Sequence, residues 1–302
     1  MQLRLSTILF TALFCGLLTA CGGDSTPSQQ ERKTDSFIVA VNSPLQYFAQ
    51  RLIGHEFEVR MLTPAGTDPA QWQPDIEDIL ELQQAELILL NGAGYSDWLN
   101  KVSLSESQLV VTSVAANDEW IQLEGQVSHS HGPQGEHAHS GYAFTTWMDM
   151  NLAQVQAKAV AKALQIQWPE KQADIEGNLA SLLDELAALD RGYADATTSL
   201  TKYQIVYSHP VYQYFSRRYG IPGISLHWEP DVMPSDEQWR ELGGIEADRT
   251  LFIWETHPSS EIIERMGEMG IEFVVVDPAA NIEIGRWFSV QRENIAKLAA
   301  QK

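Results

Sequence analysis

Residues 175–189 read IEGNLASLLDELAAL, and their apolar side chains recur every three or four positions, as on one face of a helix. These apolar positions are Ile175, Leu179, Leu182, Leu183, Leu186 and Leu189. A helical pattern over residues 151–166 precedes them and ends at Trp168-Pro169, because proline breaks a helix but suits the first turn of the next one. We therefore expect one long helix in the middle of the chain.

Short apolar runs of the kind that form buried strands lie on both sides of this helix. They are FIVAV (37–41), EVRML (58–62), ELILLN (86–91), QLVVT (108–112), QIVYS (204–208), GISL (223–226), TLFIWE (250–255) and EFVVVD (272–277). Helix-like segments separate the runs, and one of them begins with a capping box, Ser235 with Gln238. Because strands and helices alternate and no tight hairpin joins the two groups, we predict an α/β fold with two parallel-sheet lobes joined by the long helix.

The start of the chain has the pattern of a secretory signal. Arg4 precedes the apolar run STILFTALFCGLL (6–18), which is too short for a membrane span. The sequence Leu18-Thr19-Ala20-Cys21 resembles a bacterial lipobox, and this resemblance implies cleavage before Cys21 and lipidation of its sulfur. An ordinary signal peptide with a chance cysteine is the alternative. We expect a signal peptide over residues 1–20 and a lipidated N-terminus with a flexible, Ser- and Gly-rich tether over residues 21–36.

Composition limits the class of protein. The chain has 302 residues, 44% of them hydrophobic, and 40 acidic against 20 basic residues. That length is enough for a substantial core, and a net charge of −20 repels nucleic acid. We therefore expect a globular protein with no nucleic-acid partner.

The segment SHSHGPQGEHAHSGYAFTTW, residues 128–147, holds half of the eight histidines of the chain. These are His129, His131, His137 and His139. Histidine-rich tracts bind metals by their composition, although many do so weakly. The glycines in the segment predict a loop, over residues 128–141, that could present several imidazoles to one ion.

Several stretches in the right order resemble one family, the zinc/manganese-binding extracytoplasmic proteins of bacterial ABC metal importers. They are PLQYFAQRLIG (44–54), TPAGTDPAQWQPDIEDI (63–79), AELILLNGAGYSDWL (85–99), AFTTWMD (143–149), YSHPVYQYFSRRYGI (207–221) and VVVDP (274–278). The resemblance implies two α/β lobes joined by a rigid helix, a metal cleft between the lobes, and an importer permease as partner. It also implies a location in the cell envelope, on the periplasmic side in a Gram-negative cell.

The usual ligand set of this family is three histidines and one carboxylate, and the chain matches part of it. His209 of Ser208-His209 corresponds to the third histidine, and Asp277 corresponds to the carboxylate. Ala70 and Thr145 stand where the other two histidines are expected, so both ligands of the N-terminal lobe are missing. Two plainer roles remain open: His209 could be a packed core residue, and Asp277 could cap the helix that follows it.

We predict that one or both of His137 and His139 replace the missing ligands, while His129 and His131 are accessory metal collectors. A purely accessory or solvated loop is the alternative. The sequence WETHP, residues 254–258, places Glu255 and His257 after another predicted strand, and they are a second pair of candidate ligands. Three weaker observations concern other residues: His227 is a weak candidate, His55 is expected in an exposed turn, and Trp72, Trp98 and Trp147 are expected to be packing anchors.

The leading functional hypothesis is a lipid-anchored protein that captures Zn²⁺, with Mn²⁺ as the alternative, and delivers it to an ABC importer. Zinc is preferred because loop imidazoles would make the site rich in nitrogen. A secreted zinc metalloenzyme with Glu255 as its base is a second hypothesis, although no HExxH or G-x-S-x-G motif is present. An adhesin or scaffold derived from the family is a third. The expected parts are the N-terminal lobe (37–150), the helical region with the linking helix (151–200) and the C-terminal lobe (201–302).

Overall fold

The computed structural model describes residues 36–123, 127–130, 136–139, 141–229 and 232–301. The predicted signal peptide, Cys21 and nearly all of the predicted tether lie outside these residues. Residues Ser36–Lys302 form one compact unit. None of the helices in the described ranges combines the length and apolarity that a membrane crossing requires.

The N-terminal lobe is built on a parallel sheet with the strand order β2-β1-β3-β4. Its strands are β1 (Phe37–Ala40), β2 (Glu58–Arg60), β3 (Leu87–Leu90) and β4 (Leu109–Val111), and its helices are α1 (Ser43–Ile53) and α2 (Ile76–Leu82). The central strands β1 and β3 are buried along their whole length, which explains why both read as continuous apolar runs.

The C-terminal lobe repeats this plan, with the parallel strand order β10-β9-β7-β8. Its strands are β7 (Gln204–Tyr207), β8 (Gly223–Ser225), β9 (Thr250–Trp254) and β10 (Glu272–Val275), and its helices are α5 (Gln213–Tyr219), α6 (Asp236–Gly243), α7 (Ser260–Glu268) and α8 (Trp287–Ala299). All eight predicted strands are therefore present, each one or two residues shorter than its apolar run. The predicted capping box of Ser235 and Gln238 opens α6.

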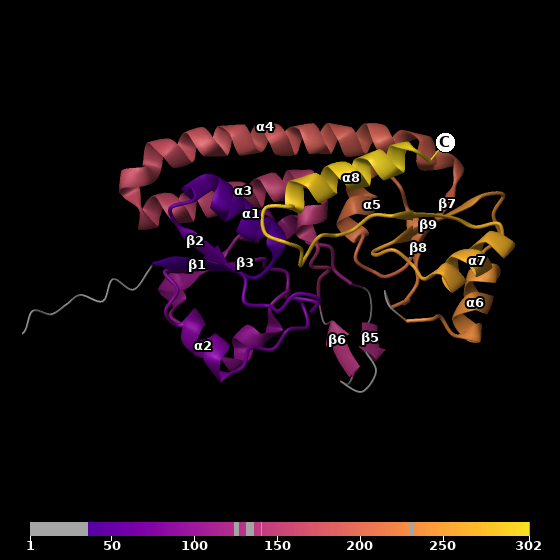
Figure 1. The fold of residues 1–302 in the computed structure, drawn as a ribbon, viewed down its shortest axis with the longest axis horizontal. Coiled ribbons are helices and arrows are strands. Elements are labelled where there is room, and N and C mark those ends of the chain that lie inside the picture. The colour runs from indigo at the N-terminus through magenta and orange to yellow at the C-terminus, as the bar shows by residue number, and fades with distance from the viewer. Residues whose placement is uncertain (1–35, 124–126, 131–135, 140, 230–231, 302) are drawn as a thin grey trace, which may run out of the picture. The chain divides into compact units, whose positions relative to one another are not determined.

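One long helix connects the lobes. After α3 (Met150–Gln167), a single 3₁₀ turn at Pro169–Lys171 leads into α4 (Gln172–Thr197), whose 26 residues span about 39 Å at the usual rise per residue. Figure 1 shows α4 running along both sheets. The first half of α4 contacts the N-terminal lobe, where Asn178 Nδ2 donates to the Leu52 carbonyl (3.0 Å). The second half contacts the C-terminal lobe, where the Tyr193 hydroxyl donates to Gln291 (2.7 Å).

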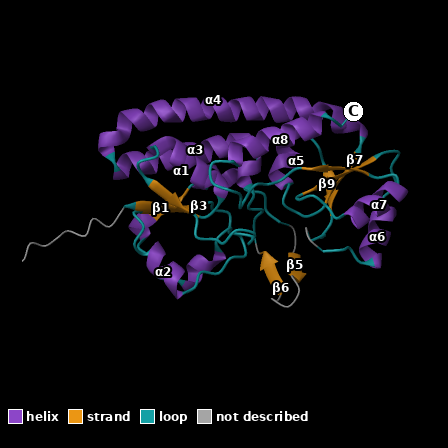
Figure 2. Ribbon diagram, in the orientation of Figure 1, coloured by secondary structure: helices purple, strands orange, loops and turns teal. Residues whose placement is uncertain are grey.

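The predicted apolar face of α4 is the face that packs against the core. Ile175, Leu182, Leu186 and Leu189 are buried, while Leu179 and Leu183 are half-buried. Residues of both sheets, such as Leu89 of β3 and Ile253 of β9, belong to one continuous buried cluster that α4 helps to cover. In the view of Figure 2, α3, α4 and α8 all lie along one side of the two sheets. The prediction of two α/β lobes with a connecting helix is thus confirmed.

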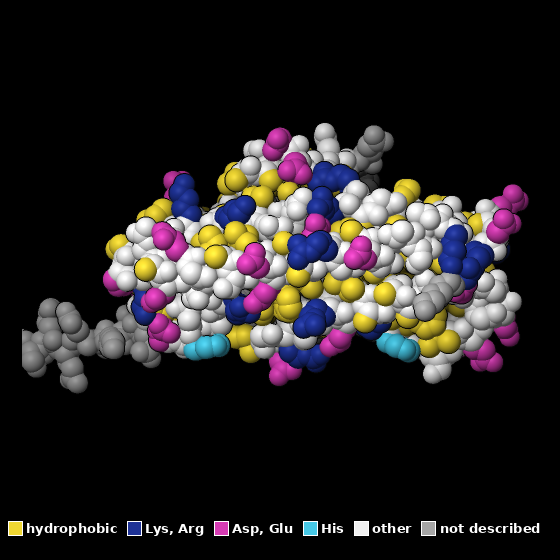
Figure 3. All heavy atoms as spheres, turned by 90° about the horizontal axis from the view of Figure 1, so that it is seen from above, with side chains coloured by type: hydrophobic (Ala, Val, Ile, Leu, Met, Phe, Trp, Pro, Cys, Tyr) yellow, Lys and Arg dark blue, Asp and Glu magenta, His cyan; other side chains and the backbone are white. Residues whose placement is uncertain are grey.

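The face formed over α4 and α8 carries acidic and basic side chains interspersed with apolar ones (Figure 3). A nucleic-acid surface needs a continuous stripe of basic side chains. This face has no such stripe among the residues that the structure describes.

The histidine-rich segment differs from the predicted loop. Val127–Ser130 (β5) and Glu136–His139 (β6) form an antiparallel pair, in which His129 lies opposite His137 and Val127 lies opposite His139. The glycines at positions 132, 135 and 141 stand outside both paired segments in the sequence, so they do not oppose the pairing. The side chains of His129, His137 and His139, and the whole of His131, lie outside what the structure describes.

Candidate functional site

All four strands of the C-terminal sheet are followed by a titratable side chain at their carboxyl ends. His209 follows β7, Glu229 follows β8, Glu255 follows β9 and Asp277 follows β10. In parallel α/β sheets this edge is where ligands bind. The sheet order therefore brings an imidazole and three carboxylates to one side of the lobe.

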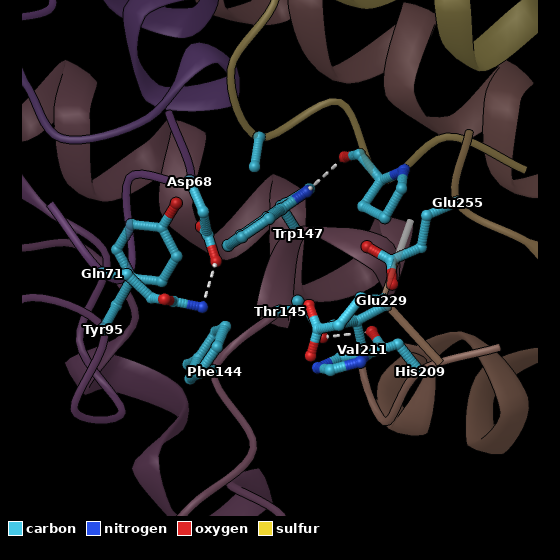
Figure 4. A pocket seen from close by; sticks show the side chains of 12 residues that line it. Asp68, Gln71, Tyr95, Phe144, Thr145, Trp147, His209, Val211, Glu229 and Glu255 are labelled. Carbon is cyan, nitrogen blue, oxygen red and sulfur yellow. Dashed lines mark hydrogen bonds between the residues drawn. The ribbon is translucent and has the colours of Figure 1, made fainter. Parts of the chain in front are cut away.

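Three of these four side chains line one pocket of about 180 Å³ together with residues of the N-terminal lobe. The lining consists of Asp68, Gln71, Tyr95, Phe144, Thr145, Trp147, His209, Val211, Glu229, Glu255, Pro278 and Ala280. Figure 4 shows Asp68 and Gln71 on one side of the pocket, and His209, Glu229 and Glu255 on the other. Both lobes thus contribute polar groups to the same cavity.

Asp68 is held in place by a tight turn that its own sequence encodes. Thr67 N–H donates to the Pro64 carbonyl (3.1 Å), and Gly66 between them has a φ of 78°, which glycine adopts without strain at this turn position. The Asp68 carboxylate then accepts hydrogen bonds from Ala70 N–H (2.9 Å) and Gln71 Nε2 (3.3 Å). Ala70, at the position of an expected ligand, is not among the residues that line the pocket.

The wall that contains Thr145 is fixed by a buried polar network. Asn91 Nδ2 donates to the Phe144 carbonyl (2.7 Å), and Asn91 Oδ1 accepts from Thr146 Oγ1 (3.2 Å) and Gln156 Nε2 (3.0 Å). Thr145 itself donates to the Val211 carbonyl (2.6 Å). The segment therefore has a defined position beside the pocket although its expected histidine is absent.

Trp147 serves as a packing anchor, as the sequence predicts, and also forms a pocket wall. It is 1% exposed, and its indole N–H donates to the Pro278 carbonyl (2.8 Å). Trp98 is also 1% exposed and meets the half-buried Trp72 edge to face, with 5.7 Å between ring centroids. All three tryptophans therefore pack as predicted.

Glu255 is the most perturbed acid in the pocket. Its Oε1 is buried and has no hydrogen-bond partner among the described residues. Burial, as the largest cause, and the carboxylates of Asp68, Glu229 and Asp277 together raise the pKa of Glu255 to about 8. A positive charge in the pocket would favour the ionised form of this group and relieve the mutual repulsion of the acids.

Asp277 and His257 line a neighbouring pocket of about 390 Å³, which shares Glu255 with the first. Asp277 Oδ1 accepts from Ala279 N–H (2.7 Å), and burial raises the pKa of Asp277. It does not cap a helix, because the next helix, α8, begins at Trp287. His257 Nδ1 lies 3.0 Å from the Pro258 carbonyl, so that nitrogen carries the hydrogen when the ring is neutral. Arg286 and Lys297 also line this pocket. The structure thus places His209 and Glu255 in the first pocket, and Asp277 in the adjacent pocket that Glu255 also lines.

No three His, Cys, Asp or Glu side chains converge closely enough to hold a metal ion in the described ranges. The donors of the first pocket face a shared space from opposite walls (Figure 4). Metal binding there requires side-chain movement toward a common point.

Sequence reasoning missed Asp68 and Glu229. The rule that strand ends carry ligands could have found Glu229, three residues beyond the predicted GISL run. For Asp68, the sequence signal is its place two residues before Ala70, the position of an expected ligand. The weaker candidate His227 meets His209 edge to face, with 6.2 Å between ring centroids, and His55 lies exposed in the turn after α1 as expected.

The comparison with protein families agrees with this architecture. The family described as zinc-uptake complex component A, periplasmic, matches residues 38–301. The chain belongs to this family. Its members are substrate-binding proteins of metal ABC transporters and not enzymes, so the metalloenzyme hypothesis has no support.

Relatives of the zinc-uptake component A family include the manganese ABC transporter substrate-binding lipoprotein PsaA of Streptococcus pneumoniae. It is 31% identical over 245 residues, which cover 78% of this chain and 74% of PsaA. The zinc-binding lipoprotein AdcA of the same species is 24% identical over 91% of this chain, which spans only 55% of AdcA.

Solved structures show the same fold. The metal-dependent lipoprotein YcdH from Bacillus subtilis has a TM-score of 0.73 at 19% identity, over 87% of this chain and 98% of YcdH. The Zn(II)-bound ZnuA-like domain of Streptococcus pneumoniae AdcA has a TM-score of 0.72 at 18% identity, over 88% of this chain and 98% of that domain.

Proposed function

We propose that this protein captures a divalent transition metal in the pocket between its lobes and delivers it to the permease of an ABC importer. Membership of the zinc-uptake component A family supports the transport role. The observation that carries the choice of pocket is the arrangement of His209 and the buried Glu255 opposite Asp68, which comes from the other lobe.

The proposed ligands in the described part of the chain are His209, Glu255, Glu229 and Asp68. Imidazole and carboxylate groups are ordinary ligands of Zn²⁺ and also suit Mn²⁺. Asp277, the carboxylate that the family resemblance implies, lines the adjacent pocket with Glu255. It remains a candidate ligand on the wall that the two pockets share through Glu255.

We propose Zn²⁺ as the metal because the histidines of residues 128–141 would add imidazole nitrogens to this oxygen-rich set. The ribbon that carries them adjoins the pocket in the chain: Leu123 N–H bonds to Gly141, Ala143 N–H bonds to Ile121, and Phe144 and Thr145 then line the cavity. His137 and His139 are the proposed ligands from this segment. Among relatives, AdcA is named as zinc-binding and PsaA as a manganese transporter protein.

The proposed location is the outer side of a membrane, with Cys21 carrying the lipid anchor. The lipobox-like sequence supports this location, as do the curated relatives that are named lipoproteins. An anchored carrier stays close to its permease, where it can be loaded and unloaded repeatedly.

A titration of the full chain tests the proposed function. The protein is purified in detergent, stripped with a chelator, and titrated calorimetrically with zinc chloride and with manganese chloride. We expect one tight site for zinc in the wild type, and its loss in His209→Ala and Glu255→Ala. His55→Ala, an exposed histidine outside the pocket, is the matched control and should bind as the wild type does. Unchanged tight binding in both pocket variants would place the metal elsewhere.

A further inference from the structure

The segment after β10 crosses from the C-terminal lobe to the N-terminal lobe, and we refer to residues 276–282 as the strap. It leaves the sheet where Val276 N–H donates to the Trp254 carbonyl (2.9 Å). At the other end, Ser43 of α1 donates its N–H to the Ala280 carbonyl (2.9 Å) and accepts from Ile282 N–H (2.9 Å). The strap is thus fixed at both ends, one end on each lobe.

Asn281 projects from the strap onto the turn that precedes Asp68. Its Nδ2 donates two hydrogen bonds, to the Pro64 carbonyl (2.8 Å) and to the Thr67 carbonyl (2.8 Å). These carbonyls are the first and last of the Pro64–Thr67 turn, so one amide group closes the turn from outside. Both hydrogens of the amide are used, which fixes the orientation of the Asn281 side chain as well.

The Asp68 side chain is held within its own loop by this turn and by local hydrogen bonds. Its carboxylate is held by the next residues of the same loop, Ala70 and Gln71, and Asp68 itself is exposed. Such a loop keeps its internal shape when it moves, so its internal hydrogen bonds do not set its distance from the opposite wall. Asn281 bonds the loop to the strap, and the strap also supplies Pro278 and Ala280 to the pocket lining.

We infer that Asn281 is a positioning residue, which sets Asp68 opposite His209 and Glu255 so that both lobes can bind one metal ion. The inference rests on the proposed function of the pocket. Asp68 is the only carboxylate that the N-terminal lobe contributes to the lining in the described part of the chain. With Ala70 and Thr145 in the places of two expected histidines, the contribution of that lobe depends on where this loop is held.

The chain offers a matched control in Asn178. Like Asn281 it is a half-buried asparagine whose Nδ2 donates to a backbone carbonyl of another segment, Leu52 (3.0 Å), but it lies on α4 away from the pocket lining. Loss of either side chain removes amide-to-carbonyl hydrogen bonds and lowers stability. Only loss of Asn281 should also change metal binding.

The test is calorimetric titration of the full chain with zinc chloride, with apo melting temperatures measured in parallel. We expect Asn281→Ala to weaken zinc binding about 10- to 100-fold, the range typical of a residue that orients a ligand. Asn281→Ser, which keeps one donor, should weaken it less. Asn178→Ala should lower the apo melting temperature comparably and leave the zinc affinity unchanged.

A double substitution separates positioning from a general structural effect. In an Asp68→Ala background, Asn281→Ala should weaken binding no further, because its target is gone. Unchanged zinc affinity in both Asn281 variants would overturn the inference, and so would an equal further loss of affinity in the Asp68→Ala background. Neither result would contradict the proposed function, as long as the wild type binds zinc and His209→Ala does not. A wild type that binds neither zinc nor manganese would instead overturn the proposed function.

Discussion

Thr145 and Val211 are joined in the lining of the pocket by a hydrogen bond of 2.6 Å, which the Thr145 hydroxyl donates to the Val211 carbonyl. Thr145 belongs to the segment that precedes α3, and Val211 follows β7 of the C-terminal lobe. The position where the family resemblance implies a metal-binding histidine therefore makes a direct contact between the lobes.

Restoring the two expected histidines should strengthen zinc binding. In Ala70→His with Thr145→His, one imidazole is added to the pocket wall at position 145 and another at position 70, next to the lining residue Gln71. We expect zinc affinity to rise at least tenfold. The Thr145→Val variant, which loses only the hydrogen bond to Val211, is the control. Calorimetric titration measures both. An affinity no higher than that of the wild type would show that these positions do not face the bound metal.

Deleting residues 129–139 should abolish stoichiometric high-affinity zinc binding, because the predicted ligands His137 and His139 are removed. The remaining described donors are one imidazole and three carboxylates, a set that suits Mn²⁺ better. The double substitution His137→Ala with His139→Ala tests the same point without shortening the chain. If the deletion variant still binds one zinc ion with unchanged affinity, the segment is only an accessory metal collector.

Glu255 should make the stability of the metal-free protein depend on pH. Its folded-state pKa is about 8 against an ordinary value of 4.5, so between these values the folded protein holds a proton that the unfolded chain has lost. The free energy of unfolding therefore falls as pH rises through this window, by at most about 1.4 kcal/mol per pH unit. Glu255→Gln lacks this group and should not show that fall.

Urea denaturation from pH 5 to pH 8.5, with a chelator present, measures the difference between wild type and Glu255→Gln. The variant should gain stability relative to the wild type as pH rises. A difference that stays constant over the whole range would mean that Glu255 is ionised in the folded protein already at low pH.

Asn91→Ala should destabilise the fold by about 2–4 kcal/mol, since it leaves the Phe144 carbonyl and Gln156 without their buried partner. Gln83→Ala, which removes an exposed amide that bonds the Ser103 carbonyl, is the control and should cost less than about 1 kcal/mol. Urea denaturation measures the free energy of unfolding of both variants. An equal decrease in this free energy in Asn91→Ala and Gln83→Ala would contradict a special role for the Asn91 network.

Cys21→Ser should release the protein from the membrane fraction, because stable anchoring requires the acyl chains that the cysteine would carry. Fractionation of cells that express wild type and variant measures the shift. A variant that remains as firmly membrane-associated as the wild type would point to another anchor.

The strands could be predicted well because each buried parallel strand needs a run of apolar residues. The buried face of α4 could be predicted because apolar residues recur every three or four positions on one side of a helix. It predicted less of the site. Glu229 was not predicted because β8 is short and exposed. Beyond β8, the N–H groups of Leu226 and Trp228 still bond to the carbonyls of Tyr207 and Ser208, so the pairing ends close to Glu229 and later than the strand itself. Asp277 follows the edge strand β10, and no sequence pattern tells which of two adjacent pockets an edge residue will face. Asp68 depends on a turn and on Asn281, 213 positions away.

The buried cluster that α4 covers has a consequence for how the protein can be divided. Since apolar residues of both sheets share that cluster, neither lobe has a complete interior of its own, and a fragment containing one lobe would expose the face of α4 that the other lobe covers. The two lobes are therefore one cooperative folding unit, expected to melt in a single calorimetric transition. Metal bound in the pocket would accordingly raise the melting temperature of both lobes together.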